Sequence, residues 1–240
     1  MGIIAKMAKD ALPRAEEIFG ERAARDGLSG TARDILKGRE EAAVAKLSQE
    51  GRDAAADVAR RAATNEPAIT STLERVVADT PGAELVGKEF RLKSDDSLLR
   101  KVAGDVDGGK TASEAAGGIN DAVRYTITSS PEEYSTVTSD AIAKMRSEGF
   151  EPIAMKNNWG DEGYQGINST WRSPSGQTFE MQFHTPESFA AKEATHTIYE
   201  MERVFPKEDP IRRLLGREQN PVFGQVTRPP GARVFDFGGG

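Results

Sequence analysis

The segment from Phe179 to His184 carries polar side chains of the kinds that could bind a nucleotide. Its apolar and polar residues alternate strictly, as they do in a strand with one buried face. Glu180, Gln182 and His184 then share the other face, so that a carboxylate, an amide and an imidazole stand in a row. A solvated strand face is the ordinary alternative.

A second alternating stretch follows Tyr164, Gln165 and Asn168, which could converge on the same side. A turn at 173–176 would join the two stretches into a hairpin. The hairpin would then present a carboxylate, amides, an imidazole and an aromatic ring. These groups suit a nucleotide base together with a metal-bound phosphate. Lys192, on the helix expected next, could edge the same pocket.

A basic cluster lies upstream of the hairpin. It comprises Arg91, Lys93, Ser94, Ser97, Arg100 and Lys101. If Ser94 or Asp95 caps a helix, the later members fall on adjacent turns near its N-terminus. Backbone N–H groups and the helix dipole would add to the side-chain charge and make a polyphosphate site. A solvated basic patch is the alternative.

The remaining sequence predicts the elements that must position these groups. Residues 1–80 favour an extension of short amphipathic helices, and Pro81-Gly82 marks a turn. Strands are expected at 123–127, 166–172 and 178–184, helices at 133–148 and 186–205, and mostly loop at 206–240. This pattern predicts an α+β fold in which helices flank a mixed sheet of about five strands.

The composition excludes several kinds of site. The chain of 240 residues has no cysteine, which rules out disulfides and thiolate metal sites. Its formal net charge of −6 disfavours broad binding to nucleic acid. No stretch approaches the ~20 apolar residues of a membrane helix, and we expect neither a membrane association nor a signal peptide.

Four segments, in order, resemble the motifs of alarmone synthetases of the RelA/SpoT type, especially the small stand-alone ones. Residues 90–101 match the ATP-binding pattern Arg-x-Lys-Ser-x-x-Ser-x-x-x-Lys at every fixed position. Asp121 with Arg124 resembles the central strand, although the family places its Asp and Arg further apart, so a register that uses Asn120 is the alternative. Residues 162–168 resemble the acceptor motif and 179–185 the last strand. The resemblance covers about residues 85–205. It implies a pyrophosphotransferase domain at 81–205, between the helical extension and the tail.

The resemblance also implies a role for each matching residue. Asp121 and Glu180 would hold Mg²⁺, Glu180 would help to deprotonate the attacking 3′-hydroxyl, and Arg124 would support the transferred group. The ATP-binding residues would be Arg91, Lys93, Ser97, Arg100 and Lys101. The acceptor-binding residues would be Tyr164, Gln165, Asn168, Gln182 and His184. The physics agrees, because pyrophosphoryl transfer needs positioning and charge neutralisation, and Mg²⁺ prefers hard oxygen ligands.

The acceptor side departs from the family pattern. Asn168 stands where the family has His, and His184 where it has Arg. An adenosine nucleotide therefore becomes a credible acceptor beside guanosine, as in toxic members of the family, and an RNA 3′ end is disfavoured by the net charge. We expect a bacterial toxin that acts in the bacterial cytoplasm. It would be delivered without a signal peptide and be neutralised by an immunity protein or antitoxin.

Two rival interpretations compete with this enzyme. Residues 104–111 fit the P-loop pattern G-x-x-x-x-G-K-[ST] literally, but a helix rather than a buried strand is expected before them. The second rival is a non-catalytic nucleotide-binding domain of a phage or secretion-associated protein, which would bind ATP without turnover.

Overall fold

The computed structural model describes residues 30, 34–160, 163–202, 205, 208 and 210–235. Residues 34–46 are helical. The helices that follow are α2 (Gln49–Ala78), α3 (Asp95–Asp107), α4 (Ala112–Gly117), α5 (Tyr134–Ser147), α6 (Pro186–Glu202) and α7 (Pro210–Phe223), with short 3₁₀ turns at Lys88–Phe90 and Ala232–Val234. The strands are β1 (Glu84–Val86), β2 (Arg124–Thr128), β3 (Glu151–Asn157), β4 (Ile167–Arg172) and β5 (Thr178–His184).

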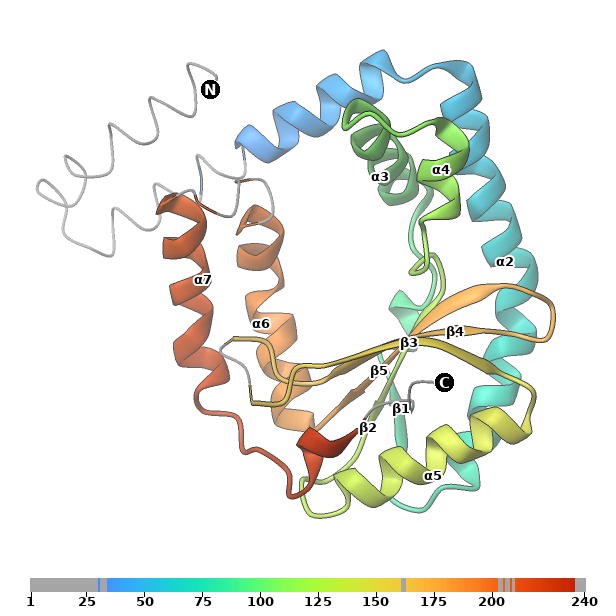
Figure 1. The fold of residues 1–240 in the computed structure, drawn as a ribbon, viewed down its shortest axis with the longest axis vertical. Helices are drawn as coiled ribbons and strands as arrows, with labels where there is room; N and C mark the ends of the chain where they lie inside the picture. The colour runs from blue at the N-terminus through green and yellow to red at the C-terminus, as the bar shows by residue number, and fades with distance from the viewer. Residues whose placement is uncertain are drawn as a thin grey trace, which may run out of the picture.

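The strands form one sheet in the order β1-β2-β5-β4-β3 (Figure 1). Only β2 and β5, among these described strands, pair in parallel, and the other neighbours are antiparallel. The predicted α+β fold with a mixed sheet of five strands is therefore confirmed for the described residues. In the parallel pair, Arg124 lies opposite Glu180, and the residues that follow each of them are paired in register.

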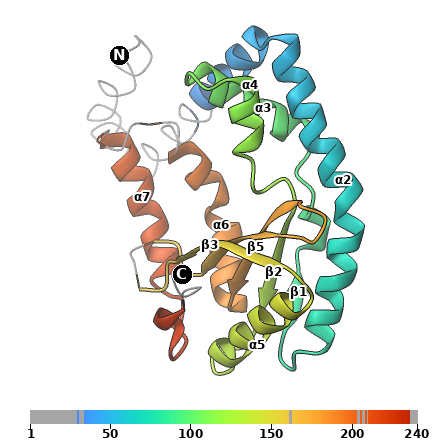
Figure 2. The same cartoon turned by 45° about the vertical axis from the view of Figure 1, so that its right-hand side comes forward.

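The two faces of the sheet differ in chemistry. The apolar residues of the two central strands are almost fully buried; they are Tyr125, Ile127, Phe179, Met181 and Phe183. This face packs towards α2 and α5, whereas α6 and α7 lie on the opposite side of the sheet (Figures 1 and 2). The strict alternation in β5 thus buries one face, as predicted, and leaves its polar residues for the other.

The N-terminal helical part contains a longer helix than expected. Short helices were predicted over residues 1–80, of which 1–29 and 31–33 lie outside the described residues, but α2 runs through 30 residues and contains Pro67. Ser48 caps its start by accepting a hydrogen bond from Gly51 N. Ile69, Leu73 and Val76 are buried in its second half, where it packs against the sheet core. Tertiary burial therefore holds together a helix whose local sequence suggested interruptions.

The expectation of mostly loop at 206–240 is wrong for α7. Pro210 is the first residue of this helix, where the missing N–H has no intrahelical partner in any case. Leu215 is buried against Met201 and Phe205, in a small cluster that joins α7 to α6. No helix in the described part of the chain has the length and apolar character that crossing a membrane would demand.

The glycine-rich segment 104–111 does not form a P-loop. Gly104 lies inside α3, which continues to Asp107, so that a helix and not a strand precedes the glycines. Lys110 forms an ion pair with Asp105 (3.2 Å), and Thr111 caps α4 in a capping box with Glu114. The segment is a connection between two helices.

Candidate active site

Two rows of polar side chains cross the face of the sheet that lies towards α6. The rows are Arg124–Glu180–Thr170 and Thr126–Gln182–Asn168, each running from β2 through β5 to β4. Residues paired in register on neighbouring strands lie about 5 Å apart and project to the same side. The structure therefore brings Arg124, Glu180, Gln182 and Asn168 together, as the sequence motifs predicted.

Glu180 lies at the centre of this polar face. Burial raises the pKa of its carboxyl, while a hydrogen bond from the Gln182 amide lowers it. The charge of Asp121 raises the pKa further, and Arg124 and Lys192 act in the opposite direction. Asp121 and Glu180 are thus close enough for their charges to interact. A carboxylate whose pKa is raised is better suited to accept a proton than an exposed glutamate.

Asp121 holds two lysines of the predicted ATP-binding segment. Lys93 Nζ lies 2.5 Å from one carboxylate oxygen and Lys101 Nζ lies 2.6 Å from the other. Burial opposes ionisation of this carboxyl, but the two lysines outweigh it and lower its pKa to about 2. The backbone fixes the arrangement, because Lys93 N donates to Ala122 O at 3.0 Å.

Arg91 is anchored by a residue that the motifs did not reveal. Its Nε lies 2.6 Å from an oxygen of Glu66 on α2, and its Nη1 donates to Lys88 O at 2.8 Å. Arg124 sits beside it, since Arg124 N donates to Arg91 O at 2.9 Å. Glu66 occupies a position in the buried stripe of α2, between Ala62 and Ile69. A carboxylate in an apolar stripe is the sequence signal that could have identified it.

The hydrogen bonds and ion pairs of Ser97 and Arg100 are made with residues other than Asp121. Ser94 caps α3, as predicted, and its hydroxyl bonds to both the amide and the hydroxyl of Ser97. Arg100 instead turns towards Glu40, 3.3 Å away, and lines a pocket between residues 34–46 and α3. The structure therefore does not bring Arg100 to Asp121, although one of its nitrogens also reaches Ser97 Oγ at 3.1 Å.

The predicted acceptor side is a hydrogen-bonded chain in which Tyr164 and Asn168 are partly exposed and His184 and Ser188 are buried. The Tyr164 hydroxyl bonds to Asn168 Oδ1 (2.5 Å) and to His184 Nε2 (2.8 Å), and His184 Nδ1 bonds to Ser188 Oγ (2.8 Å). His184 is fully buried, and burial lowers its pKa to about 3, so the imidazole is neutral. Both ring nitrogens are engaged. In this structure His184 therefore braces Tyr164 through its Nε2, and its place in acceptor binding stays a prediction.

Gln165 contacts the residues that precede β4. Its side chain is buried, accepts a hydrogen bond from Gly160 N at 3.2 Å and donates one to Gly163 O at 3.1 Å. It therefore braces the loop that leads into β4. Lys192 of α6 lies with its Nζ 5.1 Å from the centre of the Phe189 ring, within electrostatic range of Glu180.

Asp121 and Glu180 are the residues that could hold a magnesium ion. The described part of the chain contains no cluster of three or more carboxylate or imidazole ligands. Mg²⁺ often takes only one or two carboxylates together with substrate phosphates, so two are sufficient. The repulsion by Asp121 that helps to raise the pKa of Glu180 is what a cation bound between them would relieve.

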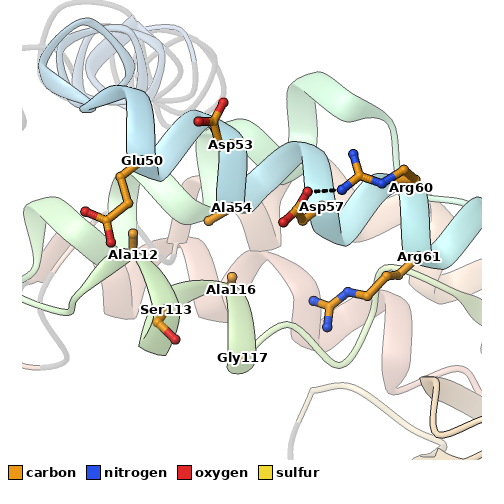
Figure 3. Close-up of a pocket in the computed structure, with 10 residues that line it drawn as sticks. All are labelled: Glu50, Asp53, Ala54, Asp57, Arg60, Arg61, Ala112, Ser113, Ala116 and Gly117. Atoms are coloured by element: carbon orange, nitrogen blue, oxygen red, sulfur yellow. Dashed lines mark hydrogen bonds and ion pairs between the residues drawn. The ribbon is translucent and has the colours of Figure 1, made fainter.

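A groove lies elsewhere, between α2 and α4 (Figure 3). It has a volume of about 700 Å³ and is lined mainly by small and charged side chains. Arg60 and Asp57 of α2 form an ion pair along it. None of the residues predicted to carry chemistry lines this groove.

Comparisons with known proteins agree with the motifs. No protein-family model matches the chain. It is 27% identical over 173 residues to the (p)ppApp synthetase toxin Tas1 of Pseudomonas aeruginosa, covering 71% of this chain and 34% of that protein. The chain therefore spans about a third of the length of its curated relative. The resemblance to RelA/SpoT-type alarmone synthetases is confirmed.

One solved structure shows the same fold. The Type VI effector Tas1, in complex with its immunity protein, superposes with a TM-score of 0.51 at 20% identity, covering 75% of this chain and 97% of that one. A GTP pyrophosphokinase family protein from Streptococcus pneumoniae gives a TM-score of 0.46 at 12% identity, over 73% and 90% of the two chains. The first of these supports the fold alone.

Proposed function

We propose that this relative of the RelA/SpoT-type alarmone synthetases is an ATP-dependent nucleotide 3′-pyrophosphokinase. It would transfer the β,γ-pyrophosphate of ATP to the 3′-hydroxyl of a purine nucleotide. The observation that carries the proposal is the convergence of Lys93 and Lys101 on Asp121, within electrostatic range of Glu180. Two cations and two carboxylates then meet at the polar face of the sheet, as transfer of a charged group requires.

The lysines and the start of α3 are suited to the triphosphate. Phosphate oxygens can replace Asp121 as partners of Lys93 and Lys101, since ammonium groups bind either anion. The first turn of α3, capped by Ser94, adds backbone N–H groups. Mg²⁺, held by Asp121 and Glu180, would neutralise charge on the phosphates when bound. Arg91 and Arg124, which are adjacent in the backbone pairing, complete the positive side.

Glu180 is proposed as the base for the attacking hydroxyl. The acceptor 3′-oxygen forms a bond to the β-phosphorus of ATP, and the bond from that phosphorus to the oxygen bridging to the α-phosphate breaks. AMP leaves with that oxygen, and the proton of the 3′-hydroxyl passes to the Glu180 carboxylate. Gln182 keeps this carboxylate in place through its hydrogen bond.

An adenosine nucleotide is the proposed acceptor. The curated relative is named as a (p)ppApp synthetase, and Asn168 and His184 replace the His and Arg of the family pattern. Tyr164, which His184 and Asn168 hold through its hydroxyl, would stack on the purine. By the same comparison we propose a toxin that acts in the bacterial cytoplasm after signal-peptide-independent delivery. An immunity protein would be its partner, as in the Tas1 complex.

The test is incubation with γ-labelled ATP, Mg²⁺ and each adenosine or guanosine nucleotide in turn, with products separated by chromatography. A 3′-pyrophosphorylated nucleotide that keeps the label is expected, together with AMP. Glu180→Gln should lower turnover by about 10²-fold or more, because proton transfer by a side chain contributes that much. Glu151→Gln, an exposed glutamate on β3 paired with Arg172, is the matched control and should keep full activity.

Two results would contradict the proposal. Full turnover by the Glu180→Gln variant would remove Glu180 from the chemistry. ATP binding by the wild-type protein without a labelled product from any acceptor would instead favour the non-catalytic nucleotide-binding domain.

A further inference from the structure

Glu66 is a buried carboxylate on a helix that carries none of the recognised motifs. Its side chain is 8% exposed, and it lies on the face of α2 that packs against the sheet. A buried carboxylate destabilises a fold unless it is paired and hydrogen-bonded. The Arg91 guanidinium is its ion-pair partner, with Nε 2.6 Å from Glu66 Oε1. The pairing joins α2 to the segment predicted to bind ATP, across 25 positions of sequence.

A second set of contacts fixes the orientation of the Glu66 carboxylate. The Thr70 hydroxyl, one helical turn later, bonds to the same oxygen as Arg91. The Thr70 hydroxyl also lies 2.7 Å from the Tyr125 hydroxyl, on β2. Tyr125 follows Arg124 directly, so the network connects α2 to the strand that pairs with β5. The carboxylate is therefore held from the helix and from the sheet at once.

We infer that Glu66 is a positioning residue for ATP, acting through Arg91. The inference rests on the proposed function, because Arg91 is assigned there to the triphosphate side. The Arg91 side chain remains 38% exposed, so a ligand can reach it. A free arginine side chain samples many rotamers, and ordering it on binding lowers affinity. Glu66 orders the guanidinium in advance through Nε, and Lys88 O accepts from Nη1.

A purely structural role for Glu66 makes a different prediction. In that case its loss would weaken folding and affect both substrates alike. If Glu66 acts through Arg91, its loss should raise the KM for ATP about tenfold, as expected for a charge-assisted hydrogen bond, with a smaller change in kcat and in the KM for the acceptor. The effect should also vanish when Arg91 is already absent.

The experiment is a double-mutant cycle with Glu66→Gln, Arg91→Ala and both together. Steady-state kinetics would be combined with the dissociation constant of α,β-methylene-ATP, whose α–β bridge cannot be cleaved. We expect Glu66→Gln and Arg91→Ala each to weaken binding of this analogue, and the double variant to bind no more weakly than Arg91→Ala alone. Glu66→Asp keeps the buried charge and serves if Glu66→Gln does not fold; it should show a smaller loss of the same kind.

Glu74→Gln is the matched control. Glu74 lies two turns further along α2 and pairs with Lys88, which neighbours the same segment, at 2.9 Å. Its loss should leave both KM values unchanged. The inference would be overturned if Glu66→Gln and Arg91→Ala reduced the affinity for the analogue additively. It would also be overturned if Glu66→Gln left analogue binding unchanged in an active enzyme. Either result would leave the proposed function intact. A wild-type protein that binds the analogue but yields no product would refute the proposed function. The double-mutant cycle, measured by analogue binding, would still test the role of Glu66.

Discussion

Replacing Asp121 by asparagine should destabilise the protein in a way that depends on pH. The carboxylate is 24% exposed and accepts from Lys93 and Lys101 on its two oxygens. The asparagine side chain would have nearly the same shape but no charge, so both ammonium groups would lose their counter-ion. The loss of unfolding free energy arises because the ionised form of Asp121 is removed. It should therefore shrink at low pH, where Asp121 is protonated in the wild-type protein.

The magnitude follows from the pKa of Asp121. The two lysines outweigh burial and lower it from 3.8 to about 2, and each pH unit of such a difference corresponds to about 1.4 kcal/mol. The carboxylate thus contributes about 2 kcal/mol at pH 7. Because the folded-state pKa is the lower one, this stability is present above pH 3.8 and is lost as the pH falls towards 2. About half should remain at pH 3.

The assay is urea denaturation of both proteins at pH 7, 5 and 3, followed by tryptophan fluorescence. Trp159 and Trp171 are both buried and should report global unfolding. The difference in unfolding free energy should be about 2 kcal/mol at pH 7 and 5, and about 1 kcal/mol at pH 3. Asp140→Asn, on the exposed side of α5, is the control and should show no such trend. A difference that stays constant across the three pH values would refute the reasoning.

Two further predictions test the polar face. The acid limb of kcat/KM should lie above pH 4.5, because burial raises the pKa of Glu180 and the base must be ionised; a profile that is flat down to pH 4.5 would contradict this. His184 cannot supply that limb, since its pKa is about 3. Gly166→Ala should lower the unfolding free energy by about 1–3 kcal/mol in urea, because its Cβ would lie 2.5 Å from the His184 ring at a φ of +155°. Gly176→Ala, at φ +85° with open space around it, should cost less.

The fold was predictable where the hydrophobic periodicity and the turn residues indicate the same elements. The alternation in β5 and the turn signals at 173–176 predicted the hairpin, and α5 ends at Ser147 shortly before Gly149, whose φ is +83°. The length of α2 was not predictable, because Pro67 suggests a break, and only burial of residues such as Leu73 against the sheet shows why the helix continues. Helix α7 was missed because the glycines and prolines of 206–240 suggested loop. An apolar cluster shared with α6 stabilises this helix.

The site was predictable as a set of motifs, but less so as a set of contacts. Spacing in Arg91–Lys101 predicted cations at a helix start, and pairing with 122–124 places two of them at Asp121. Spacing cannot distinguish a side chain that meets a ligand from one that braces its neighbour. His184 shows this, because its strand position puts it on the polar face, whereas its ring is fully buried and hydrogen-bonded to Ser188 and Tyr164.

Charge pairing suggests how the proposed site would accommodate a triphosphate. Lys93 and Lys101 share Asp121, and Arg91 is bound to Glu66, so each of these three cations has a carboxylate partner. Partly buried cations need such partners, since unpaired charges are costly away from water. The two kinds of partner differ, however. Asp121 is a predicted metal ligand and can give up its lysines to phosphates, whereas Glu66 lies on α2 and is fixed by Thr70. We therefore expect ATP with Mg²⁺ to exchange the partners of the lysines while the Arg91–Glu66 pair persists as the fixed edge of the site.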